Sequence, residues 1–242
     1  MLSTMSVKNK KVAILQSNYI PWKGYFDLIA YVDEFIFYDL AQFTKNDWRN
    51  RNQIKTSNGL KWLSIPVKMK GHLNRSIKET EIIQNGWQKK HWQSLLHSYS
   101  KAPYFSEIAG WLEPMYMESE QKYLSALNRD FIKKICEYLN IKTTISNVWD
   151  YKLMGGKSEK LVHLCQQCQA TTYVSGPSAK DYLETNLFEK ADIQVEWFEY
   201  ANYPEYKQFH GEFNHHVSIL DLLFHCGPNS AQYMKHIKKR QL

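Results

Sequence analysis

The sequence predicts an α/β fold built on a mostly parallel, Rossmann-like sheet with a helical insertion or cap. Short apolar runs typical of buried strands alternate along the chain with segments of helical periodicity, which is the pattern of an α/β protein. A longer stretch, at about 86–141, has helical periodicity throughout. We therefore expect residues 1–242 to form a single α/β domain with a helical insertion at about 86–141.

The first 85 residues are predicted to hold strands around one helix. The run KVAILQ at 11–16 indicates a buried strand, because a short apolar run is bounded by lysines and polar residues. A turn containing Pro21 and Gly24 then leads into a helix that ends near residue 33. The remaining strands of this part are expected at 34–39, 60–68 and 76–83.

Helical spacing dominates the middle of the chain. Residues 86–102 form one predicted helix, and residues 116–141 form a long amphipathic helix with an apolar stripe. Strands and helices then alternate again. The strands are expected at 143–150, 171–176 and 193–200, and the helices at 158–170 and 218–227.

The composition is that of a soluble globular chain rich in aromatic residues. Hydrophobic residues make up 43%, charged residues 23% and aromatic residues 14%. The formal charge of +7 favours anionic partners, and grooves that stack on sugars or bases use Tyr and Trp. No apolar run approaches the roughly 20 residues of a membrane span. The first residues lack a signal-peptide apolar region, so we expect a cytoplasmic protein.

The cysteine pattern indicates a reduced protein. Cys165 and Cys168 form a C-x-x-C, but a structural zinc site needs four ligands and the sequence has no second pair. Together with Leu161 and Leu164 they fall on one helical stripe, which predicts that both face the core. No metal site is predicted, and the sequence assigns no cofactor.

Polar and aromatic residues follow the first predicted strand, in the loop 16–24. Ligands of open α/β sheets bind beyond the carboxyl ends of the strands. Gln16, Asn18 and Tyr19 offer hydrogen bonds at that place. Trp22 offers a stacking face, and Gly24 permits a close approach of the backbone. The alternative is a tight, well-packed turn without a ligand.

A second polar stretch leaves the end of the strand 34–39 and is expected beside the loop 16–24. Arginine forks bind phosphate through paired hydrogen bonds, and amide groups recognise sugar hydroxyls or base edges. We expect Trp48 to be packed and Arg49 or Arg51 to face a phosphate. The residues expected in this wall are Asp39, Gln42, Lys45, Trp48, Arg49, Asn50, Arg51 and Asn52.

The segment WQKKHW at 87–92 places Lys90 and His91 between two tryptophans. A histidine can act as a base near neutral pH, and a lysine can stabilise developing negative charge. The alternative is an exposed helix whose lysines are solvated and whose tryptophans anchor it to the core.

The segment YVSGPSAKDYL at 173–183 places small polar residues between a strand and a predicted helix. Backbone N–H groups and hydroxyls at such a position suit a phosphate or a carboxylate. Ser178 would also make an ordinary helix N-cap, which is compatible with binding. The substrate-binding candidates in this segment are Ser175, Gly176, Ser178 and Tyr182.

Taken in order, these segments resemble the WbqC-like protein family. The matching segments run from about 11 to 228 and are LQSNYIPWKGYFDLI, DEFIFYDLAQFTKNDWRNRNQIK, WLSIPV, KKHWQSL, YVSGPSAKDYL and FNHHVSILDLLFHCG. The family is associated with gene clusters for O-antigen and other surface polysaccharides. The resemblance therefore implies a role in making or decorating an unusual sugar.

We therefore expect an enzyme that transfers an acyl or aminoacyl group to a nucleotide-linked amino sugar. His91 is the predicted base, Lys90 and Asp39 complete the predicted catalytic set, and Arg49 or N–H groups at 175–178 would stabilise charge. The expected partners are the nucleotide-linked sugar and an acyl or aminoacyl donor. Nucleic acid is not expected as a partner, except a charged tRNA that serves as the donor.

Two other classes of protein stay open. The strand–loop–helix at 11–32 suggests an ATP-dependent ligase or a nucleotidylyltransferase, although it contains neither a Walker loop nor a GxGxxG. A nucleic-acid-binding module is supported by the basic-aromatic stretch 45–55 and the tail KHIKKRQL, but no recognised nucleic-acid motif accompanies them.

Overall fold

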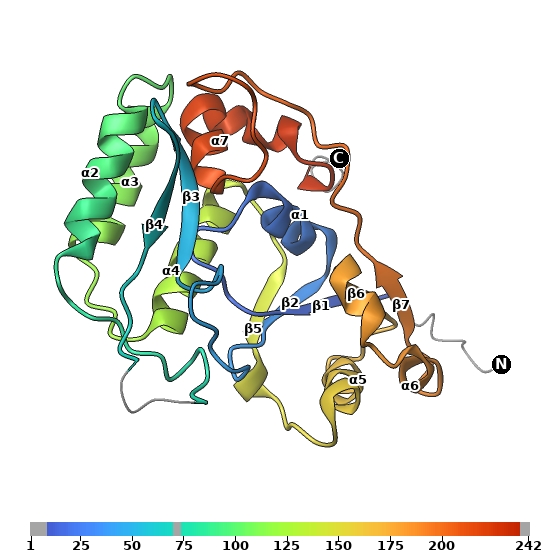
Figure 1. The fold of residues 1–242 in the computed structure, drawn as a ribbon. Helices are drawn as coiled ribbons and strands as arrows, with labels where there is room; N and C mark the ends of the chain where they lie inside the picture. Colours follow the sequence, from blue (N-terminus) through green and yellow to red (C-terminus); the bar gives the residue numbers. More distant parts are fainter. Residues whose placement is uncertain (1–8, 70–73, 238–242) are drawn as a thin grey trace.

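A parallel sheet forms the centre of the protein, as the alternation of strands and helices predicts. The computed structural model describes residues 9–69 and 74–237, so the first eight residues and most of the basic tail lie outside it. In the described residues, five parallel strands pair in the order β5-β2-β1-β6-β7 (Figure 1). They are β1 (Lys11–Leu15), β2 (Glu34–Phe37), β5 (Thr144–Asn147), β6 (Thr172–Ser175) and β7 (Gln194–Trp197). The predicted α/β class is confirmed.

The strand order reverses direction at β1, and this reversal places a candidate site. The helix α1 (Lys23–Tyr31) carries the chain from β1 to β2, and β5 continues the sheet outward on that side. On the other side of β1 lie β6 and β7. Ligands of such sheets bind beyond the carboxyl ends of the strands at the reversal. The loops after β1 and β6 meet this condition.

Successive strand residues face opposite sides of the sheet, as the two-residue period of a strand requires. Ala13 and Phe35 belong to the apolar cluster formed with α1, α4 (Leu124–Tyr138) and α7 (Ile219–Cys226). Val12 and Ile36 belong to the apolar cluster formed with α5 (Lys157–Gln167) and α6 (Thr185–Glu189). Figure 1 shows α1 and α7 above the strands and α5 and α6 below them.

An antiparallel hairpin and two helices stand beside the sheet. The hairpin pairs β3 (Arg51–Thr56) with β4 (Gly59–Ser64), and α2 (Trp87–Tyr99) and α3 (Phe105–Met117) lie on its outer side (Figure 1). The stretch at about 86–141, where the helical insertion is predicted, therefore holds α2, α3 and α4. Its apolar residues join the same cluster as Ala13 and Phe35.

The structure corrects the predicted helix at 116–141. The chain leaves the helical conformation after Met117 and re-enters it at Leu124. The intervening residues pair with a distant segment, since the Lys122 carbonyl accepts from the Ile82 N–H and the Thr80 carbonyl accepts from the Leu124 N–H. This long-range pairing, at 2.9 Å for both bonds, replaces the helical hydrogen bonds of that turn.

One strand prediction is also corrected, and one strand of the structure was not predicted. Residues 76–83 form isolated bridges rather than a strand, although Ile77 and Ile82 are buried as their apolar character predicts. The polar segment 51–56 is the strand β3, with Asn52 and Ile54 on its buried side. Several predicted strands also end earlier in the structure: β4 ends at Ser64, β5 at Asn147 and β7 at Trp197.

Two buried aspartates attach the C-terminal part of the chain to the helices. Asp221 accepts hydrogen bonds from the hydroxyls of Tyr99 (2.8 Å) and Tyr206 (2.7 Å) and from the side-chain amide of Gln208 (2.8 Å). Asp27 in α1 similarly accepts from the Tyr203 hydroxyl at 2.8 Å. Donors of this kind offset the cost of taking a carboxylate out of water.

The buried cysteines of α5 generate a test of the predicted core stripe. Cys165 and Cys168 are free thiols buried in the apolar cluster formed with α5 and α6, as predicted. We expect Cys165→Ser to lower the free energy of unfolding by about 1–3 kcal/mol, because it buries a hydroxyl without a partner. Cys168→Ala should cost less, and both variants should keep wild-type ligand binding. Chemical denaturation measures the stabilities, and stoichiometric zinc lost from both variants would contradict a purely apolar role.

Candidate functional site

A buried carboxylate fixes the loop that follows β1. Asp39, at the end of β2, accepts hydrogen bonds from the Ser17 N–H and the Ser17 hydroxyl, both at 2.7 Å, and a short one from the Ser125 hydroxyl of α4. Burial raises the pKa of Asp39, and these three donors oppose the shift. Because its acceptor positions face these donors, Asp39 holds β1, β2 and α4 together at the carboxyl edge of the sheet.

The segment 47–55 lies against the loop 16–24, as predicted. The Tyr19 N–H donates to the Trp48 carbonyl at 2.9 Å, and the Arg49 guanidinium donates to the Gln16 side-chain oxygen at 2.9 Å. The Asn52 side-chain amide donates to the carbonyls of Tyr19 and Ile20, at 3.1 and 2.9 Å. Ile20 has a left-handed backbone (φ 37°), and the bond from Asn52 supports this rare conformation.

A small cavity of about 180 Å³ opens between these two segments, and we call it the indole–amide cavity. It is lined by Asn18, Pro21, Trp22, Trp48, Asn52 and His216. The side-chain oxygen of Asn18 is buried and has no hydrogen-bond partner within the described residues. A buried acceptor without a donor is costly, so this oxygen is free to accept a hydrogen bond from a ligand.

Trp48 corrects the prediction that it would be packed. Its side chain is 43% exposed, and its indole meets Trp62 of β4 with the ring centres 5.5 Å apart and the planes tilted by 42°. Trp22, on the opposite segment, is half-buried and contacts Tyr200 and Tyr203. The cavity therefore has one indole that is open to solvent, Trp48, and one that is held by neighbouring rings, Trp22.

The other side chains of the segment 47–55 are engaged in the scaffold. Asn50 donates to the Ile65 carbonyl at 3.0 Å. Arg49 makes an ion pair with Asp47 at 3.2 Å in addition to its bond with Gln16. The Arg51 guanidinium lies over the Trp62 ring at 4.1 Å. Whether Arg49 or Arg51 faces a phosphate stays a prediction.

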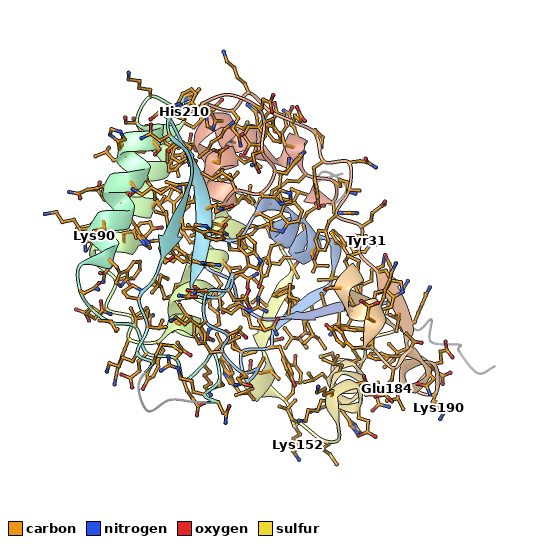
Figure 2. All side chains as sticks on the ribbon, viewed as in Figure 1. Tyr31, Lys90, Lys152, Glu184, Lys190 and His210 are labelled. Carbon is orange, nitrogen blue, oxygen red and sulfur yellow. The ribbon has the colours of Figure 1, made fainter. Side chains whose placement is uncertain are left out.

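His91 is buried in an aromatic environment. Its Nδ1 lies 2.9 Å from the Tyr19 hydroxyl, which in turn lies 2.6 Å from the Tyr116 hydroxyl. Burial lowers the pKa of His91 to about 4, and a hydrogen bond with the Ser64 backbone opposes the shift. The imidazole is therefore neutral at pH 7. Lys90 is exposed on α2 (Figure 2), and both residues are among those that line a wide, open pocket of about 1130 Å³ between α2 and β4. Their catalytic roles stay predictions.

The candidates after β6 lie apart from the indole–amide cavity. Ser175 is buried at the end of the strand and Gly176 is half-buried. A short 3-10 helix, Pro177–Asp181, follows in place of the predicted α-helix, so Ser178 is exposed and caps no long helix. Tyr182 is 69% exposed. None of these residues is among those that line the cavity.

Sequence reasoning missed a second concave site at the same edge of the sheet, which we call the cationic pocket. It has a volume of about 770 Å³ and is lined by Asn74, Arg75, Lys78, Glu79, Glu81, Tyr123, Ser125, Ala126, Arg129 and Trp149. Gln42 is exposed nearby and donates to the Asn74 side chain at 3.0 Å. His216, which lines the indole–amide cavity, was not predicted as a site residue either. No short motif links the residues of the cationic pocket, because they come from three separate segments, 74–81, 123–129 and 149.

Within the described residues, no group of three or more His, Cys, Asp or Glu side chains is arranged to hold a metal ion. In residues 9–69 and 74–237, no helix combines the length and apolar character needed to cross a membrane.

The protein is thus an α/β protein with a parallel sheet and two concave sites at the carboxyl edge of that sheet, where ligands of such folds bind. The sequence model of the WbqC-like protein family matches residues 16–233, and the chain belongs to this family. The uncharacterized protein Rv1507c of Mycobacterium tuberculosis is 54% identical over 230 residues, which cover 95% of this chain and 100% of that protein. No solved structure matches the chain.

The buried imidazole of His91 predicts a pH dependence of stability. An unfolded chain takes up a proton at this residue near pH 6.5, whereas the folded protein resists it until about pH 4. Stability is therefore lost as the pH falls through this window, with a slope of up to about 1.4 kcal/mol per pH unit from this group. In denaturation at pH 4–7, His91→Gln should show a shallower loss than the wild type. His97→Gln, at an exposed position of the same helix, is the control, and equal slopes for all three proteins would contradict the prediction.

Gly24 is required by the position of the Trp22 indole. A Cβ atom at residue 24 would lie 2.3 Å from the Trp22 ring, so the indole would have to move. We expect Gly24→Ala to lower the free energy of unfolding by about 1–3 kcal/mol and to shift the tryptophan emission. Gly110→Ala is the matched control, since a Cβ there meets no atom within 4 Å and alanine favours a helix. Unchanged stability and emission in Gly24→Ala would contradict the proposed contact.

Proposed function

We propose that the protein is an enzyme of surface-polysaccharide biosynthesis that transfers an acyl or aminoacyl group to a nucleotide-linked amino sugar. The observation that carries this proposal is the indole–amide cavity, which is lined by two indoles and two side-chain amides and includes Asn18, whose side-chain oxygen has no partner among the described residues. Membership of the WbqC-like family supports the proposal, because the family is associated with gene clusters for surface polysaccharides.

The walls of the cavity suit a sugar ring. A pyranose has apolar C–H faces and polar edges, so it is complementary to an indole on one side and amides on the other. Asn18 can accept from a hydroxyl or an amine, and the exposed Trp48 can cover a ring face. The cavity volume of about 180 Å³ is below the range usual for whole ligands, about 300–1,000 Å³, which favours a single sugar ring.

Acyl transfer to an amine needs a base and a stabilised oxyanion. The sugar nitrogen attacks the carbonyl carbon of the donor, a C–N bond forms, and the bond to the leaving group breaks. The base takes the proton from the nitrogen and returns it to the leaving sulfur or oxygen. His91 is the base predicted from the sequence. His216 is a second candidate, because its side chain lines the cavity.

Mass spectrometry of a panel of nucleotide amino sugars tests the reaction. Each sugar is incubated with thioester donors and with charged tRNA, both with and without ATP and magnesium. A product formed with a thioester or a charged tRNA alone supports the transferase. Consumption of ATP in every productive reaction would instead assign the protein to the ligases, the alternative class. Parallel assays of His91→Ala and His216→Ala identify the base by a loss of turnover of about a hundredfold or more.

Asn18→Ala and Trp48→Ala should weaken binding of the sugar substrate that this panel identifies. We expect roughly a tenfold rise of Kd for each variant, since each removes one direct contact with the ring. Lys45→Ala, at an exposed position in the same part of the chain, should bind within about twofold of the wild type. Isothermal titration measures the three affinities. Equal affinity in all of them would show that the cavity does not hold the sugar.

A further inference from the structure

The cationic pocket holds three positive side chains at the carboxyl ends of β2 and β5. Arg75 and Lys78 come from the segment before α2, Arg129 comes from α4, and Trp149 follows β5. The pocket volume of about 770 Å³ lies within the range of small-molecule sites, about 300–1,000 Å³. The pocket is therefore large enough for the nucleotide part of a ligand, which the indole–amide cavity is not.

Arg75 is a buried cation, and Glu81 is an acidic neighbour that acts on it electrostatically. Its side chain is 8% exposed, and its Nε and Nη1 atoms have no hydrogen-bond partner in the part of the chain that the structure describes. Its Nη2 donates only to the sulfur of Met69, a weak acceptor, at 3.5 Å. Leaving guanidinium donors buried and unpaired costs free energy, which an anionic ligand would recover.

The two carboxylates of the pocket are engaged with other groups. One oxygen of Glu79 accepts from the N–H and the hydroxyl of Ser76, at 3.0 and 2.6 Å. Glu81 forms ion pairs with Lys68 at 2.7 Å and Lys122 at 3.7 Å. The pocket is lined by three cations and two carboxylates, so its net charge stays positive.

Trp149 and Asn147 hold the other two cations in place. The Lys78 ammonium lies 4.3 Å and the Arg129 guanidinium 4.9 Å from the centre of the Trp149 ring. Arg129 also donates to the Asn147 side-chain oxygen at 2.6 Å. Cations held in this way lose little freedom when a ligand binds, so they can bind an anion more tightly than freely moving surface lysines.

We propose that the cationic pocket binds the diphosphate group of a nucleotide through Arg75, Lys78 and Arg129. This inference rests on the proposed function, because it assigns the nucleotide part of the sugar substrate to residues outside the segment 47–55. The two sites are connected by hydrogen bonds. Ser125 lines the pocket and donates to Asp39, and Asp39 accepts from Ser17, the neighbour of Asn18.

Isothermal titration with inorganic pyrophosphate, with UDP, ADP, GDP, CDP and dTDP, and with uridine tests the proposal at low salt. We expect pyrophosphate and at least one nucleoside diphosphate to bind, and uridine not to bind. Lys78→Met should weaken binding at least about fivefold. Lys89→Met makes the same change of charge at an exposed position of α2 and should bind as the wild type does. Raising the salt concentration about tenfold should weaken the wild type and abolish the difference between the variants.

Arg75→Met separates a binding role from a structural one. Removing a buried charge with unpaired donors should leave the melting temperature unchanged or raise it, while diphosphate affinity falls at least about fivefold. A lower melting temperature with unchanged affinity would overturn the proposal. It would also be overturned by wild-type affinity in Lys78→Met, by an equal loss in Lys89→Met, or by no binding of pyrophosphate and all five diphosphates.

The same variants distinguish this inference from the proposed function. If diphosphates bind and depend on Lys78 and Arg75, but no donor yields an acylated sugar, the pocket assignment stands and the transferase proposal fails. If diphosphate affinity depends on Asn18 and Trp48 and not on Lys78 or Arg75, the nucleotide lies at the indole–amide cavity. The pocket assignment is then overturned while the transferase proposal stands.

Discussion

The buried carboxylate of Asp39 is the contact on which the candidate site depends. A carboxylate taken out of water must be compensated by hydrogen-bond donors, and here they come from the loop after β1 and the first turn of α4. Ser17 and Ser125 cannot move apart without leaving this charge unpaired. One end of the network therefore borders the indole–amide cavity and the other borders the cationic pocket, so the two concave sites keep a fixed relation.

The segment 47–55 shows how so polar a stretch can be ordered. Its amides satisfy backbone carbonyls that the irregular loop 16–24 leaves without secondary-structure partners, as Asn52 does for Tyr19 and Ile20. Arg49 is held in the same way by Gln16. Because these side chains supply the order, Trp48 is not needed as an anchor and its indole remains open to solvent. The stretch is thus scaffold along most of its length and open to solvent at its tryptophan.

Sequence periodicity predicted those elements whose buried face is apolar, such as β1 and α7. It missed β3 because the buried side of this strand carries the polar Asn52 beside the apolar Ile54. The Asn52 amide can be buried because it donates to backbone carbonyls far away in the sequence, so the strand lacks the apolar alternation by which strands are recognised. Sequence periodicity extended α4 back to residue 116 because the break before this helix is caused by pairing with residues 80–82, which no local pattern records. The neighbourhood of the loop 16–24 and the segment 47–55 was predictable, since both follow parallel strands. The cationic pocket was not, because Arg75, Arg129 and Trp149 come from distant segments without a common motif.

Unpaired buried polar atoms give the carboxyl edge of the sheet its chemical character. The Asn18 oxygen and two nitrogens of Arg75 lack partners among the described residues, and each such atom costs on the order of 1–3 kcal/mol. Their polarities are opposite, since Asn18, which lines the indole–amide cavity, has an unpaired acceptor, and Arg75, which lines the cationic pocket, has unpaired donors. A ligand with hydroxyl or amine donors at one end and anionic acceptors at the other would satisfy both groups. A sugar joined to a diphosphate has this arrangement, so under the proposed function its binding would recover stability that the fold loses at this edge.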